Sequence, residues 1–162
     1  MIKVFGHKAP DTDATASAII WAWYMKQKGI NAVPYVLGKP NTEAAFVINY
    51  WGFDIPDILK DIEKGEDVII VDTNNPAELP NNISNANIIE IIDHHLLIGG
   101  LKTNKPISIT IKPLASTGTK TLVVRPQQQQ KTALCVSSLR NALNPLNYPF
   151  INTVSSTTFS SM

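Results

Sequence analysis

Two runs dominated by β-branched residues, 68–71 and 88–92, constrain the fold of this chain more than any other feature. Neither run shows the alternation of apolar and polar residues that marks a strand with one face in water. Uninterrupted apolar strands of this kind are typical of the centre of a parallel sheet, where both faces are covered. We therefore expect these two runs to be the central strands of such a sheet.

Strands and helices are expected to alternate along the first 111 residues. The remaining predicted elements are strands at 2–5, 32–36 and 107–111 and helices at 13–28, 42–51 and 55–64. This alternation predicts an α/β fold, an open and mainly parallel sheet flanked by helices with right-handed crossovers. In such sheets, ligands bind at the carboxyl ends of the strands.

Charge is divided unevenly along the chain. Residues 1–100 hold seven Lys and all 13 acidic residues, a net charge of −6, whereas residues 101–162 hold seven Lys or Arg and no acidic residue. From about residue 119 the alternation of strands and helices also stops, and a Gln tract and a Ser/Thr-rich end follow. We expect residues 1–119 to form one domain and residues 120–162 to be an irregular or disordered tail. A shifted reading frame after about residue 119 is our hypothesis for this change.

Composition also restricts location and partners. No apolar run approaches the ~20 residues that cross a bilayer, and the N-terminus meets a charged motif too early for a signal peptide. A cytoplasmic protein without a membrane partner is therefore expected. The total charge of +1 gives no sign of a strongly basic nucleic-acid-binding protein, so no nucleic-acid partner is predicted.

Polar clusters follow three of the predicted strands, namely residues 6–13 (Gly-His-Lys-Ala-Pro-Asp-Thr-Asp), Asp72, and residues 93–95 (Asp-His-His). Because parallel strands bring their carboxyl ends to one edge, these clusters are expected to converge. Carboxylates packed this closely repel unless a cation lies among them. A set of imidazoles and carboxylates without thiolates suits Mn, Co, Fe or Zn. Its size favours a dinuclear site with a bridging carboxylate, which is suited to phosphoryl transfer.

Simpler explanations exist for each residue. Asp13 can cap the helix that starts there, Asp11 can organise the preceding turn, and Asp72 can be solvated at a strand end. All three His of the chain, however, lie in two of these clusters. That coincidence favours one common site over separate explanations.

Three segments carry a resemblance to a known family. Residues 6–14 resemble the opening motif of manganese-dependent (family II) inorganic pyrophosphatases, and residues 93–95 match the signature of the DHH phosphoesterase superfamily that contains them. Residues 113–119 are similar to the family's segment after the next strand. The resemblance covers residues 1–119 and implies a hydrolase that cleaves pyrophosphate into two phosphates at a site with two Mn²⁺ ions, with Co²⁺ or Mg²⁺ as substitutes. The DHH triplet alone also admits other phosphoesterases acting on oligonucleotides or polyphosphate, and an inactive metal-binding remnant is a third interpretation.

The resemblance implies a role for each candidate residue. Five residues would bind the two manganese ions: His7 and Asp11 at one, Asp13 and His94 at the other, and Asp72 between them. His95 would be the catalytic residue that contacts phosphate and helps to protonate the leaving group. Asp93 would orient the neighbouring histidines.

Several features depart from the family pattern. Residues 72–75 read Asp-Thr-Asn-Asn where the family usually reads Asp-His-Asn-Glu. No acidic residue follows Asp93, so the one that completes the second metal site in the family is missing. The second domain, whose Arg and Lys grip the substrate, is also missing. We therefore expect low or absent activity for this chain. Family members pair through sheet edges, which makes a homodimer a further possibility.

Overall fold

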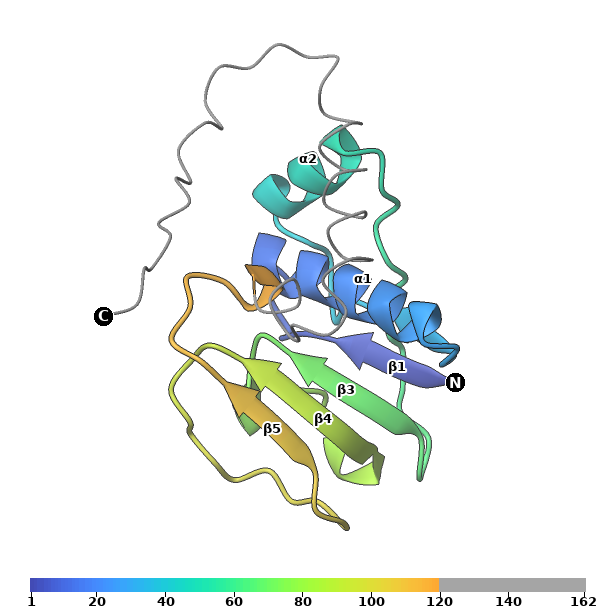
Figure 1. Cartoon of the computed structure of the whole chain (residues 1–162), viewed down its shortest axis with the longest axis vertical. Coiled ribbons are helices and arrows are strands. Elements are labelled where there is room, and N and C mark those ends of the chain that lie inside the picture. The colour runs from blue at the N-terminus through green and yellow to red at the C-terminus, as the bar shows by residue number, and fades with distance from the viewer. Residues whose placement is uncertain (120–162) are drawn as a thin grey trace, which may run out of the picture. The chain divides into compact units, whose positions relative to one another are not determined.

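A five-stranded parallel sheet forms the centre of the computed structural model, which describes residues 1–119 (Figure 1). The predicted tail, residues 120–162, lies outside the described residues. The strands lie in the order β2-β1-β3-β4-β5. Their bounds are Ile2–Phe5 (β1), Ala32–Pro34 (β2), Asp67–Val71 (β3), Asn87–Asp93 (β4) and Ser108–Ile111 (β5). The sheet confirms the predicted α/β fold, including both central strands.

Strand order reverses between β1 and β3. From β1 the chain goes to β2 on one side, and it then returns past β1 to build β3, β4 and β5 on the other side. The carboxyl ends of β1 and β3 therefore carry loops that leave in opposite directions. A crevice at such a point is where open α/β sheets bind ligands.

The two faces of the sheet are buried by different kinds of structure. On one face, helix α1 (Thr12–Gln27) packs Ala18, Trp21 and Ala22 against the strands. Helix α2 (Thr42–Tyr50) packs against α1, as Figure 1 shows. Within residues 1–119 the other face is covered mainly by connecting segments, including the short 3₁₀ helices Pro76–Glu78 and Ile83–Asn85. The strands are therefore covered on both faces, as their continuous apolar sequence predicts.

The predicted helix at residues 55–64 is wrong. This segment runs alongside the edge of the sheet instead, because the Val36 amide donates to the Asp57 carbonyl and the Leu59 amide donates to the Val36 carbonyl. The Ile62 side chain is buried in the core beneath β3. These contacts with distant residues replace the local hydrogen bonds of a helix. None of the helices in residues 1–119 has the length and apolar character needed to cross a membrane.

Candidate metal centre

The ends of three adjacent strands carry the polar clusters. His7 follows β1, Asp72 follows β3, and His94 and His95 follow β4. Asp72 has a φ of 59°, in the left-handed region that Asp tolerates better than most residues. The chain therefore turns sharply at the end of β3, at the edge of the sheet where the other clusters lie.

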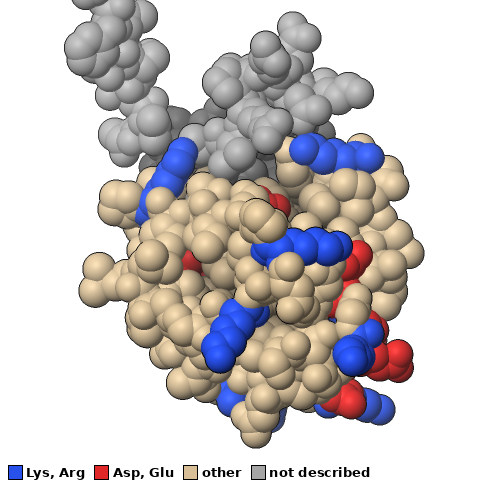
Figure 2. Space-filling view, turned by 90° about the horizontal axis from the view of Figure 1, so that it is seen from below, with Lys and Arg blue, Asp and Glu red and all other residues tan. Residues whose placement is uncertain are grey.

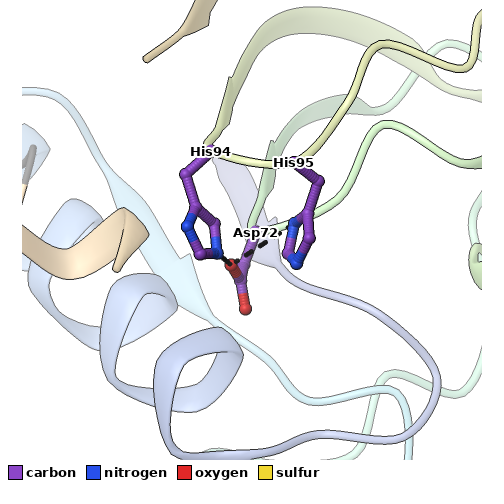
Figure 3. A group of neighbouring side chains, drawn as sticks. All are labelled: Asp72, His94 and His95. Atoms are coloured by element: carbon purple, nitrogen blue, oxygen red, sulfur yellow. Dashed lines mark ion pairs between the residues drawn. The ribbon is translucent and has the colours of Figure 1, made fainter. Parts of the chain in front are cut away.

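Asp72 lies at the centre of the group, and its two carboxylate oxygens face different imidazoles. Its Oδ2 lies 3.6 Å from His7 Nε2. Its Oδ1 lies 3.3 Å from His94 Nε2 and 3.9 Å from His95 Nδ1 (Figure 3). Only 1% of Asp72 is exposed, which excludes the explanation that it is merely solvated at a strand end. Burial is the main cause that raises the pKa of Asp72, against the opposing effect of His7 and Thr117. The same pairing with Asp72 raises the pKa of His7.

His94 is oriented by the backbone. Its Nδ1 lies 2.8 Å from the Leu114 carbonyl oxygen. Because a carbonyl only accepts hydrogen bonds, Nδ1 must carry a proton, and in the neutral ring Nε2 then has a lone pair. This Nε2 faces Asp72 and lies 3.6 Å from Asp13 Oδ2. His94 therefore presents a ligand atom toward two carboxylates.

The two aspartates of the first cluster have different environments. Asp11 is the N-cap of α1, accepting a hydrogen bond from the Ala14 amide, and it lies 3.7 Å from His7 Nε2. Asp13 does not cap this helix. Its carboxylate accepts hydrogen bonds from the Thr117 and Gly118 amides and from the hydroxyls of Ser17 and Ser116. Burial alone would raise the pKa of Asp13, but these donors outweigh it and lower the pKa.

Asp93 and His95 form a closely bonded pair. Asp93 is fully buried, and its Oδ1 accepts from the His95 ring Nδ1 at 2.8 Å and from the His94 and His95 amides. Burial would raise the pKa of Asp93, but these hydrogen bonds and one from Asn74 lower it. Asp93 in turn raises the pKa of His95, against the effect of desolvation. The pairing fixes the His95 ring relative to β4.

Two sets of candidate ligands share Asp72. One set consists of His7, Asp11 and Asp72, and the other of Asp72, His94 and His95, with the atoms of each within 4.8 Å of one another. In the second set, His95 Nδ1 is already bonded to Asp93, whereas Asp13 is within reach of His94. This mixture of nitrogen and oxygen donors without thiolate fits manganese. All of the predicted site residues lie in this region, and their individual roles stay predictions.

A cleft of about 560 Å³ adjoins the centre. The polar residues that line it are His7, Lys8, Thr73, Asn74, Asn75, Glu78 and His95. Thr73, which occupies the position of a family histidine, donates a hydrogen bond to Glu78 at 2.6 Å. The apolar side chains of Leu96 and Ile98 also line the cleft.

Sequence reasoning missed the residues that hold the candidate ligands in place. Asn74 donates to Asp93 and to the Leu96 carbonyl and accepts from the Ile98 amide, which joins the ends of β3 and β4. Thr117 contacts both Asp13 and Asp72. For Thr117, the only available signal was the resemblance of residues 113–119 to a family segment.

Comparisons with known proteins agree with this geometry. Residues 1–142 match the DHH family, N-terminal domain. The "Manganese-dependent inorganic pyrophosphatase" of Methanothrix thermoacetophila is 42% identical over 119 residues, which are 73% of this chain and 38% of that protein. The "Probable manganese-dependent inorganic pyrophosphatase" of Deinococcus radiodurans is 36% identical over 119 residues, 74% of this chain and 38% of that protein.

Solved structures show the same fold. A candidate family II inorganic pyrophosphatase from Methanococcus jannaschii matches with a TM-score of 0.68 and 34% identity, over 84% of this chain and 41% of that one. An exopolyphosphatase-related protein from Bacteroides fragilis matches with a TM-score of 0.60 at 15% identity, over 94% of this chain and 48% of that one, which shows the fold alone. The chain thus spans 38% of the length of the two named relatives and less than half of each of the two solved structures.

Proposed function

Because this chain belongs to the DHH family, we propose that it forms the metal-binding part of a manganese-dependent inorganic pyrophosphatase, a hydrolase. The names of the relatives support this assignment over the 119 aligned residues. The chain spans 38% of these relatives, so hydrolysis of pyrophosphate to two phosphates is our proposal for the function that this part serves.

The observation that carries the proposal is the position of Asp72 between two imidazoles. Its oxygens lie 3.6 Å from His7 Nε2 and 3.3 Å from His94 Nε2. We infer that Asp72 would contribute to holding both Mn²⁺ ions, and that His7 and Asp11 would hold one of them. Asp13 and His94 would hold the other, because Asp13 Oδ2 lies 3.6 Å from His94 Nε2 while His95 Nδ1 is bonded to Asp93.

The remaining residues handle the substrate. When bound, the two ions would neutralise phosphate charge and make a water molecule nucleophilic near neutral pH. His95 lines the cleft, and its bond to Asp93 fixes the ring while leaving Nε2 to meet a phosphate oxygen. Hydrolysis forms one P–O bond to water and breaks the bridging P–O bond. We assign to His95 the proton that the departing phosphate takes up.

Turnover by this chain alone is expected to be low. Lys8 is the cation that lines the cleft, while both arginines of the sequence, Arg125 and Arg140, lie outside the described residues. No acidic residue follows Asp93 to complete the second metal site in the family manner. Phosphoryl transfer depends on positioning and on charge neutralisation, so these losses weaken catalysis more than metal binding.

The expectation that nucleic acid is not the partner remains a proposal. On the face that Figure 2 presents, Lys side chains are separated by uncharged surface, and most of the visible acidic side chains lie toward one side. A nucleic-acid-binding protein typically has a continuous basic patch or stripe.

The first test is calorimetric titration of the chain with Mn²⁺, with Co²⁺ and Mg²⁺ titrated in parallel. We expect two bound Mn²⁺ ions in the wild type. Asp72→Asn should weaken both sites, because the amide offers one oxygen and no charge. Asp54→Asn is the matched control, since Asp54 is exposed on a loop. Binding of two ions by Asp72→Asn with wild-type affinity would refute the bridging role.

The second test compares substrates. The manganese-loaded chain is assayed on pyrophosphate, tripolyphosphate and dinucleotides. If another reading frame of the coding DNA yields a longer form, that form is assayed in the same way. We expect a preference for pyrophosphate and low turnover by the 162-residue chain. A clear preference for a dinucleotide would favour another DHH phosphoesterase. Metal binding without any hydrolysis in either form would favour an inactive remnant. Size-exclusion chromatography tests the homodimer.

A further inference from the structure

The segment after β5 is a loop that passes into a helical turn at Thr117, and it contacts three of the proposed metal ligands at once. Its Leu114 carbonyl accepts from His94 Nδ1, its Ser116 hydroxyl donates to Asp13, and its Thr117 side chain donates to Asp72. Asp13 and Asp72 lie 104 and 45 residues before Thr117 in the sequence. This loop therefore joins the start of α1 and the ends of β3 and β4.

Thr117 makes hydrogen bonds to two of these proposed ligands, Asp13 and Asp72. Its backbone amide donates to Asp13 Oδ2 at 2.8 Å, and its Oγ1 lies 2.9 Å from Asp72 Oδ1. An ionised carboxylate only accepts hydrogen bonds, so the Thr117 hydroxyl is the donor. Thr117 is 0% exposed, which leaves water little access to replace that donor. One residue thus holds the buried Asp72 carboxylate and the half-buried Asp13 carboxylate in a fixed relation.

Asp72 Oδ1 is also the oxygen that faces His94 Nε2, at 3.3 Å. A carboxylate oxygen can accept about two bonds. The Thr117 hydroxyl occupies one of these two positions on Oδ1, which restricts rotation of the carboxylate about its Cβ–Cγ bond. The second position on Oδ1 is left for an ion beside His94. Removing the hydroxyl would free this rotation and leave the buried charge with one donor fewer.

We propose that Thr117 is a positioning residue that fixes Asp72 and Asp13 for the manganese ion on the His94 side. This inference rests on the proposed function and adds a residue that contacts no substrate. It predicts unequal effects at the two ions, because the His7 side of Asp72 uses the other oxygen, Oδ2. Groups that orient metal ligands typically contribute about 10–100-fold to metal affinity.

The test uses three variants of the whole chain. Thr117→Val keeps the shape and removes the donor, whereas Thr117→Ser keeps the donor. Thr15→Val is the matched control, because Thr15 is also 0% exposed but its hydroxyl has no hydrogen-bond partner within residues 1–119. Mn²⁺ affinity and stoichiometry are measured by calorimetry, and the environment of bound Mn²⁺ by electron paramagnetic resonance. Circular dichroism in EDTA verifies folding.

We expect Thr117→Val to bind one of two Mn²⁺ ions about 10–100-fold more weakly, with an altered resonance spectrum. Thr117→Ser should restore both, and Thr15→Val should match the wild type. Wild-type affinity in Thr117→Val, or an equal loss in Thr15→Val, overturns the inference and leaves the proposed function standing. Failure of the wild type itself to bind Mn²⁺ overturns the proposed function and this role with it. Thr117→Ala provides a second hydroxyl-free variant if Thr117→Val does not fold, and wild-type affinity in it has the same meaning.

Discussion

Substitution of Gly6 by Ala tests whether close contact between β1 and α1 sets the geometry of the metal centre. A Cβ at residue 6 would lie 2.7 Å from Ala14 Cβ, 3.2 Å from Ala14 Cα and 3.2 Å from the Val71 carbonyl oxygen. Carbon atoms in ordinary contact are about 3.5–4.0 Å apart, so the first distance is short by about 1 Å. Two of these three neighbours are backbone atoms, which cannot rotate away. We expect Gly6→Ala to cost about 1–3 kcal/mol in the free energy of unfolding, the usual range for overpacking.

The same displacement should reach the candidate ligands. His7 follows Gly6 directly, Asp11 caps the helix that Ala14 belongs to, and Asp72 follows Val71. Moving the start of α1 away from the strand ends would therefore separate His7 and Asp11 from Asp72. We expect weaker Mn²⁺ binding as well as lower stability, measured by calorimetry and by urea unfolding in EDTA.

Ala14→Gly provides the control, because it removes the atom that is closest to the new Cβ. Alone it should cost about 1 kcal/mol, the ordinary penalty for glycine in a helix. If the steric argument holds, the double variant loses less stability than the sum of the two single variants, by at least about 0.5 kcal/mol. Strict additivity, or a Gly6→Ala variant with wild-type stability and Mn²⁺ affinity, would refute the reasoning.

Further predictions concern acid sensitivity, the corrected segment and metal removal. Asp93 has a lowered pKa in the fold, so its stabilising contribution is present above its unfolded pKa of 3.8 and is lost as the pH falls through the lower folded pKa. In urea unfolding with EDTA, Asp93→Asn should have a lower free energy of unfolding than the wild type at pH 7, and this difference should shrink toward pH 3. A difference that stays constant with pH would contradict the prediction. Ile62→Ala should cost about 2–5 kcal/mol in the free energy of unfolding because Ile62 is buried. Ile58→Ala should cost less than about 1 kcal/mol because Ile58 is 53% exposed. Equal costs in urea unfolding would contradict this structure of the segment, since residues four apart lie on the same face of a helix. Mn²⁺ at 100 times the dissociation constant of a site should stabilise the chain by about 2.7 kcal/mol for each such site, and EDTA should abolish the shift in a thermal melt.

The sequence predicted the sheet well because the evidence for it is local. Residues 68–71 are apolar without interruption, and Val68 and Ile70 bury on one face while Ile69 and Val71 bury on the other. The predicted helix at 55–64 is wrong because the structure of this segment depends on contacts that are not local. Its apolar spacing is compatible with a helix, but the hydrogen bonds with Val36 and the burial of Ile62 depend on residues distant in the sequence.

The candidate site likewise contains residues that local sequence evidence predicts and residues whose role depends on distant contacts. His7, Asp72 and His94 were found because each lies within two residues of the end of a predicted strand, and parallel strands bring such positions together. Thr117 has no comparable signal, since a threonine after a strand is common and its contacts lie 45 and 104 residues away. The cap of α1 was expected at Asp13, and this was wrong, because Asp11 caps the helix instead. Asp11 Oδ1 accepts from the Ala14 amide and is also the oxygen that lies 3.7 Å from His7 Nε2. Capping and metal binding are compatible, since a carboxylate oxygen has a second lone pair.

Comparison of the buried carboxylates of Asp72 and Asp93 with the half-buried carboxylate of Asp13 indicates where the proposed metal centre would most need a cation. Asp13 accepts hydrogen bonds from four groups of the chain, and Asp93 also accepts from four. Both have lowered pKa values, so the fold itself stabilises their charge. Asp72 is as deeply buried as Asp93 yet accepts one such bond in the described part of the chain, from Thr117, and its pKa is raised. Of these three carboxylates, the one whose charge the described residues compensate least is therefore Asp72, our proposed bridging ligand, where two divalent ions would compensate it from both sides.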